Sequence, residues 1–145
     1  MDRISRCAAL LVILAAAALA GCSRTSSAAG PLPPPAHVTA GSHGAVSVVL
    51  TPLGAQRAGI QTAAAARAGL HGQVVVPYSA LLYQPNGSSV VYAVTGPLTY
   101  TLATVSVASM QGSQVYLTGL TPGTVVVTVG GEELLGVQDG VGVET

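Results

Sequence analysis

Residues 72–130 read GQVVVPYSALLYQPNGSSVVYAVTGPLTYTLATVSVASMQGSQVYLTGLTPGTVVVTVG, and this stretch decides the fold. Short runs rich in Val, Tyr and Thr alternate with Gly, Pro and Asn, which is the pattern of strands joined by turns. The predicted strands are residues 73–76, 89–95, 100–108, 115–117 and 125–129. The spacing of the strands and turns predicts an all-β barrel or small sandwich.

The turn residues between these runs support the same prediction. Asn86-Gly87 forms a turn because glycine adopts a positive φ at low cost. Gly96-Pro97, Gln111-Gly112 and Thr121-Pro122-Gly123 break the pattern in the same way. All five tyrosines lie at positions 78–116, so we expect the best-packed core there. In the strand over 89–95, alternation places Val90, Tyr92 and Val94 on one face.

The flanking segments add short elements. Residues 46–51 are predicted as a strand and Pro52–Ala58 as a short helix, with Thr51 as N-cap and Gly59 at its end. Residues 61–70 favour a weak strand, and 132–135 one last helical turn. The predicted all-β domain therefore spans residues 45–138, with about six to eight short strands and one or two helical turns. A tail follows over 139–145.

The N-terminus has the pattern of an export signal. Arg3 and Arg6 precede an apolar segment over residues 7–20, which is shorter than the roughly 20 residues that span a bilayer. It ends in Leu19-Ala20-Gly21-Cys22, which resembles the lipobox of bacterial lipoproteins. This resemblance implies a signal peptide over 1–21 and acylation, such as palmitate, on Cys22. The alternative is an ordinary secretory signal that ends near a cysteine.

The segment after Cys22 is predicted to be a tether. Residues 22–44 are rich in Ser, Ala, Gly and Pro, a composition that cannot bury a core and favours an extended, polyproline-like chain. We expect this tether to hold the folded part off a membrane. The resulting localisation is the cell envelope, with lipid in the outer face of the cytoplasmic membrane or the periplasmic side of the outer membrane.

Composition argues against several function classes. The chain has no Lys, and its five Arg are balanced by five acidic residues, so it lacks the basic patch that nucleic-acid binding requires. The chain has two cysteines: Cys22 is the predicted acylation site, and Cys7 lies within the predicted signal peptide. We therefore expect no disulfide, cysteine redox site or cysteine metal site in the mature chain.

Few residues are candidates for chemistry. His37, His43, His71 and Met110 are the possible soft metal ligands, and their spacing matches no known metal motif. Glu132-Glu133 is the only acidic pair, and neighbouring helical side chains point about 100° apart, so a solvated helix start is expected. The sequence shows no activated nucleophile and no phosphate-binding loop. We expect neither an enzyme nor a cofactor.

Three segments resemble a known family when taken in order. They are VPYSALLY (76–83), VVYAV (90–94) and GLTPGTVVVTVG (119–130), followed by ELLG (133–136). Together they are similar to the membrane-proximal domain of periplasmic adaptor subunits, or membrane fusion proteins, of RND-type efflux pumps. Residues 48–60 resemble the opening of the adaptor β-barrel, so the resemblance covers residues 46–136.

The resemblance is to a truncated adaptor. Adaptors also carry a lipoyl-like domain and a long helical hairpin, and the few residues between Leu70 and Gln73 leave no room for either. The resemblance implies a non-enzymatic, lipid-anchored accessory protein that docks on an RND-type transporter. Two alternatives stay open. One is a free-standing envelope lipoprotein with a structural or sensory role, and the other is a metal-handling lipoprotein using His71 and Met110.

Overall fold

The structure is a computed structural model and describes residues 34–41, 45–69 and 72–140. The predicted signal peptide (1–21), Cys22 and most of the predicted tether lie outside these residues. His43, His71 and residues 141–145 of the predicted tail are also outside them. None of the helices in the described ranges is long and apolar enough to cross a bilayer.

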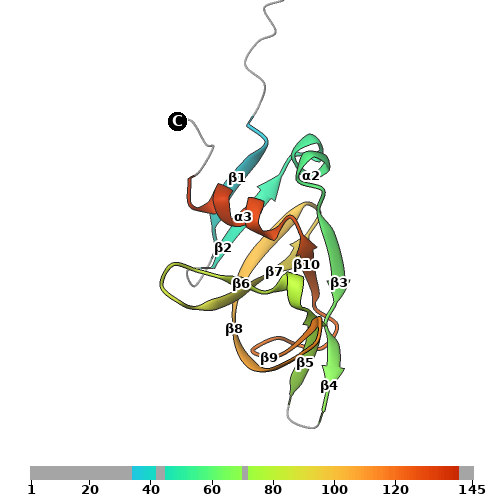
Figure 1. Ribbon diagram of the computed structural model, residues 1–145. Helices are drawn as coiled ribbons and strands as arrows, with labels where there is room; N and C mark the ends of the chain where they lie inside the picture. The colour runs from blue at the N-terminus through green and yellow to red at the C-terminus, as the bar shows by residue number, and fades with distance from the viewer. Residues whose placement is uncertain (1–33, 42–44, 70–71, 141–145) are drawn as a thin grey trace, which may run out of the picture. The chain divides into compact units, whose positions relative to one another are not determined.

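The described residues form an all-β domain, as predicted, with two α-helices and one 3-10 helix (Figure 1). The strands are β1 (Ala36–Ala40), β2 (Val46–Leu50), β3 (Gln61–Ala64), β4 (Ala66–Ala68), β5 (Gln73–Pro77), β6 (Leu82–Tyr83), β7 (Ser89–Gly96), β8 (Thr99–Gln111), β9 (Gln114–Thr118) and β10 (Val125–Val129). The helices are α2 (Pro52–Ala58), η3 (Tyr78–Ala80) and α3 (Gly131–Gln138).

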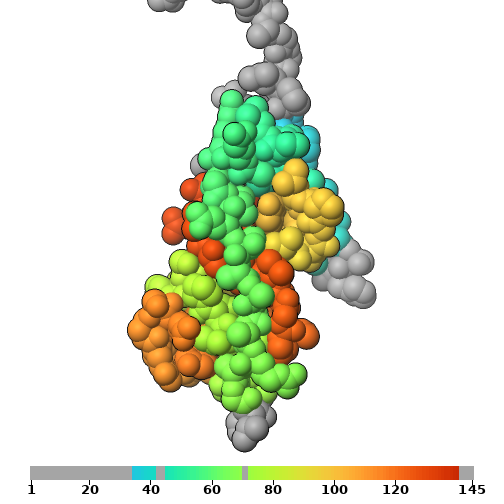
Figure 2. All heavy atoms as spheres, turned by 90° about the vertical axis from the view of Figure 1, so that its right-hand side faces the viewer, coloured from blue at the N-terminus to red at the C-terminus, as the bar shows by residue number. Residues whose placement is uncertain are grey.

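The sheet is nearly closed into a barrel. Its main path is β3-β10-β7-β8-β9-β5-β4, so it begins and ends with two strands that follow one another in the chain. Ala65 separates them: its amide donates to the Thr124 carbonyl at 2.8 Å, and its carbonyl accepts from the Gly123 amide at 2.8 Å. In the space-filling view, β3 and β4 run down the surface from α2 (Figure 2). One continuous segment thus joins the two ends of the sheet.

Two clusters of buried side chains hold the domain together. We call the first the barrel core; it contains Ala65, Val74, Val76, Ala80, Leu81, Val91, Val105, Val115, Leu117 and Val126. We call the second the outer core; it contains Ala36, Val48, Leu50, Leu82, Val90, Tyr92, Tyr100, Val127 and Leu134. The outer core includes side chains from β1, β2 and α3, which gather at one end of the domain (Figure 1).

Strand β7 contributes to both cores, which corrects the expectation of one buried face. Residues 90–93 are all buried. Val91 belongs to the barrel core, whereas Val90 and Tyr92 belong to the outer core. Adjacent residues of a strand point to opposite faces. Sheet strands covered on both faces lose the apolar–polar alternation of a half-exposed strand. Strand β7 therefore separates the two cores and contributes one face to each of them.

The tyrosines contribute unequally to the core. Tyr92 is fully buried and Tyr100 is 6% exposed, but Tyr78 and Tyr83 are 46% and 50% exposed. Tyr116 is half-buried on β9. The core is filled mainly by Val and Leu, because the short strands of a small barrel leave little interior space for aromatic rings.

The predicted tether ends earlier than Gly44. Residues 36–40 form β1, which pairs antiparallel with β2 from Ala36↔Leu50 to Ala40↔Val46. Only Ala36 of this strand is buried, and His37 is exposed. The Pro-, Ser-, Ala- and Gly-rich composition of residues 22–44 predicted a tether, and the short alternation of apolar and polar residues in AHVTA (36–40) was not recognised within it. The folded domain therefore begins before residue 45.

The short helix α2 matches its prediction in detail. Thr51 caps it: the Thr51 hydroxyl accepts from the Gly54 amide at 3.0 Å. Pro52 begins the helix, and Gly59 ends it with φ +60°. The predicted weak strand over 61–70 is present as β3 and β4. Helix α3 runs from Gly131 to Gln138 and is longer than the single turn expected.

Burial of Tyr92 is expected to make the domain less stable at alkaline pH. Burial, followed by the negative charge of Asp139, raises the pKa of Tyr92 well above its ordinary value of 10.0. Above pH 10 the unfolded chain loses this proton while the folded chain keeps it, so unfolding is favoured. We expect the free energy of unfolding to fall as pH rises above 10.

The variant Tyr92→Phe isolates this contribution. Chemical denaturation of both proteins between pH 8 and 12 is expected to show a smaller decline for Tyr92→Phe above pH 10, because phenylalanine cannot ionise. Parallel declines in the two proteins would contradict the assignment. Some decline of the free energy of unfolding with pH is expected to remain in Tyr92→Phe, because burial also raises the pKa values of Tyr83 and Tyr100.

Candidate functional site

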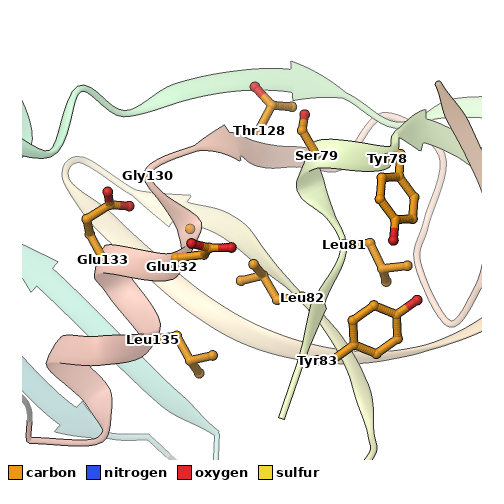
Figure 3. Close-up of a pocket in the computed structure, with 11 residues that line it drawn as sticks. Tyr78, Ser79, Leu81, Leu82, Tyr83, Thr128, Gly130, Glu132, Glu133 and Leu135 are labelled. Carbon is orange, nitrogen blue, oxygen red and sulfur yellow. The ribbon is translucent and has the colours of Figure 1, made fainter.

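The described residues contain a surface cleft of about 690 Å³ (Figure 3). Three parts of the chain form it: the segment from η3 to β6, the end of β10, and the first turn of α3. Its lining residues are Tyr78, Ser79, Leu81, Leu82, Tyr83, Thr128, Gly130, Gly131, Glu132, Glu133 and Leu135.

The cleft lies over the boundary between the two cores. Leu81 belongs to the barrel core and is 6% exposed, and the next residue, Leu82, belongs to the outer core and is 8% exposed. The 3-10 helix η3 produces this division, because it ends at Ala80 and the chain turns there into the two-residue strand β6. The floor of the cleft is therefore apolar and held in place by both cores.

Two tyrosines form one end of the cleft. Tyr78 and Tyr83 extend from η3 and β6, and their hydroxyl groups point toward one another (Figure 3). Partial removal from water raises the pKa of Tyr83, and the charge and hydrogen bonding of Tyr78 raise it further. The Tyr83 hydroxyl is therefore neutral at physiological pH, and it is a polar group beside two exposed aromatic rings.

Two glycines bring the start of α3 close to the cleft. Gly130 is the N-cap, with φ +85°, and its carbonyl accepts from the Leu134 amide at 3.2 Å. A side chain at Gly131 would begin 3.1 Å from a methyl carbon of Leu82. The absence of a side chain at Gly131 lets the helix begin directly against β6, whereas a side chain at Gly130 would overlap Ile60 and the Ala58 carbonyl.

The first turn of α3 carries the charge of the cleft. Glu132 and Glu133 are both exposed, which fits the predicted solvated helix start. Negative side chains at this position are stabilised by the partial positive charge of the helix N-terminus. Both residues also line the cleft, which the sequence did not predict. Arg57 and Arg67, the arginines of the described residues, are not among its lining residues.

The other sequence candidates lie apart from the cleft. His37 is exposed on β1, and Met110 is 49% exposed near the end of β8. Within the described ranges, no group of three or more His, Cys, Asp or Glu is placed to hold a metal ion. The pairing of Met110 with His71 stays a prediction, because His71 lies outside those ranges, as does the predicted lipidation site Cys22.

The cleft brings together the segments that carry the family resemblance. Nine of its eleven lining residues belong to VPYSALLY (76–83), GLTPGTVVVTVG (119–130) or ELLG (133–136). These segments are far apart in the sequence. Residues of these three motifs thus share one surface, whereas the fourth motif, VVYAV (90–94), contributes no residue to the cleft lining.

The chain was compared with models of protein families, with curated proteins and with solved structures, and nothing matches it.

Proposed function

We propose that this chain is a non-enzymatic, lipid-anchored accessory protein that docks on an RND-type efflux transporter at the cell envelope. The observation that carries the proposal is the convergence of the adaptor-like segments at one cleft of one β domain. Three of the four adaptor-like segments are therefore available together to a single partner at this cleft.

The N-terminal signal supports a role at the membrane. Acylation of Cys22 would hold the domain at a bilayer, since lipid anchors with two or more acyl chains bind durably. Residues 23–35 link that cysteine to β1. Confinement near a membrane raises the effective concentration toward a membrane partner, so modest surface contacts are sufficient for docking.

The docking differs from that of a complete adaptor. Between β4 and β5 the chain has only residues 69–72, where an adaptor would insert its lipoyl-like domain and helical hairpin. In this proposal the accessory protein contacts the transporter, and it does not bridge the transporter to an outer-membrane channel.

The test is crosslinking in intact cells, followed by purification through a C-terminal tag and mass spectrometry. A transporter subunit recovered in near-stoichiometric amount is the expected result. The control keeps residues 1–33 and replaces residues 34–145 with an unrelated β domain carrying the same tag. This control separates docking by the domain from enrichment by the anchor.

Two outcomes would overturn the proposal. Equal recovery of the transporter with the control would show that the anchor alone explains the association. Recovery of only the lipoprotein, or of unrelated envelope proteins, would favour a free-standing structural or sensory lipoprotein.

A further inference from the structure

We propose that the cleft is a binding site for an amphiphilic organic cation, with its apolar body beside Tyr78 and Tyr83 and its amine near Glu132 and Glu133. This inference goes beyond the proposed docking and does not depend on it. It rests on the size, the lining and the charge distribution of the cleft.

The size of the cleft suits a small organic molecule. Its volume of about 690 Å³ lies within the range of roughly 300–1,000 Å³ that is usual for ligand sites. Its floor does not have to form on binding, because Leu81 and Leu82 are already fixed in the two cores. A preformed floor reduces the entropy lost when a ligand is held.

The cleft has an apolar end and a charged end. Tyr78 and Tyr83 lie at one side and the carboxylates of Glu132 and Glu133 at the other, with Leu82 between them (Figure 3). The two rings offer aromatic faces and edges to an apolar or aromatic group. A molecule that spans the cleft therefore meets apolar surface at one end and negative charge at the other.

The charge distribution selects a cation. The lining includes two carboxylates and neither Arg57 nor Arg67; Glu133 also borders a second hollow, which Arg57 lines, so Glu132 is the carboxylate that belongs to this cleft alone. An anion in this cleft would be repelled by both carboxylates, whereas an ammonium group would be attracted. An ammonium group near a tyrosine ring also gains from the negative face of the ring. The sign of the ligand charge is thus set by the site.

A bare metal ion fits the site less well. Glu132 and Glu133 are successive residues of a helix, so their side chains diverge by about 100°. Calcium requires six to eight oxygen ligands around one point. Two diverging carboxylates can share a diffuse organic cation but do not form such a cage.

The test is equilibrium dialysis of the mature chain, from residue 22 onward, which contains every residue of both cores. Three probes share one apolar body: a naphthylbutylamine, its N-acetyl derivative and a naphthylbutyrate. The expected order of affinity is amine, then amide, then carboxylate. An equal or reversed order, or no binding of the amine at millimolar concentration, would overturn the proposal.

Paired variants locate the charged end. Glu132→Gln is expected to weaken amine binding by roughly 2- to 5-fold, the range for a partly exposed charge pair, and to leave amide binding unchanged. Asp139→Asn removes the same charge just after the other end of α3, outside the cleft lining, and is expected to leave both unchanged. Equal effects of the two variants would place the amine elsewhere.

A second pair locates the apolar end. Tyr83→Ala is expected to weaken amine and amide binding alike, by roughly 3-fold or more, because both lose the ring contact. Met110→Ala is the matched control: Met110 is 49% exposed, Tyr83 is 50% exposed, and only Tyr83 lines the cleft. Binding that is unaffected by Tyr83→Ala would show that the probes occupy another surface.

Discussion

Replacing Tyr92 with alanine is expected to lower the free energy of unfolding by about 3–5 kcal/mol, the usual cost of removing a buried ring. Tyr92 is 0% exposed and lies on β7, the strand shared by the two cores. The outer core packs the strands against α3, so a cavity at Tyr92 would leave Leu134 without part of its packing. Urea denaturation at pH 7 measures the change.

Tyr92→Phe is the matched variant. It keeps the ring and removes the hydrogen bond from the Tyr92 hydroxyl to Gln138 Oε1, which is 2.9 Å long. The expected loss is about 0.5–1.5 kcal/mol, the net contribution of one hydrogen bond. If Tyr92→Ala cost no more than Tyr92→Phe, the outer core would not be the well-packed layer described above.

Replacing Gly54 with alanine is expected to destabilise the domain by about 1–3 kcal/mol, the usual cost of overpacking. Gly54 is buried in α2, and a Cβ there would overlap the carbonyl oxygen of Pro35. That carbonyl is fixed because it accepts from the Thr51 amide at 2.9 Å and the Thr51 hydroxyl at 3.2 Å. The chain before β1 or the helix must therefore move.

Gly136→Ala is the control for helix propensity. Gly136 lies in α3, and a Cβ there would have no atom within 4 Å. Alanine is favoured over glycine inside a helix, so this variant is expected to gain about 0.5–1 kcal/mol. The two substitutions are chemically identical and should change the urea midpoint in opposite directions. A stabilising Gly54→Ala would mean that α2 does not pack against Pro35.

Local signals in the sequence predicted much of the fold. The helix α2, its Thr51 cap and its Gly59 end follow from rules that involve only neighbouring residues. The turn at Gly123 is equally local: the Thr124 amide donates to the Thr121 carbonyl at 3.1 Å. The strand pattern of residues 72–130 gave the fold class for the same reason.

Features that depend on distant packing were not predictable in this way. The sequence of β1, AHVTA, alternates apolar and polar residues, but the run is short, it follows a Pro-rich segment, and only Ala36 of it enters a core. The burial of both faces of β7 depends on β1, β2 and α3 covering the outer side. The cleft also escaped prediction, since Leu81 and Leu82 are neighbours in the chain that enter different cores.

The near-closure of the sheet has a consequence for the order of folding. Strand β3 pairs with β10, almost the last element of the described chain, whereas its continuation β4 pairs with the nearby β5. During synthesis or translocation from the N-terminus, the edge of β3 stays without its partner until β10 emerges. Contacts so distant in sequence form slowly. The barrel is therefore completed only after β10 has emerged, and until then the unpaired edge of β3 can pair with other chains and aggregate.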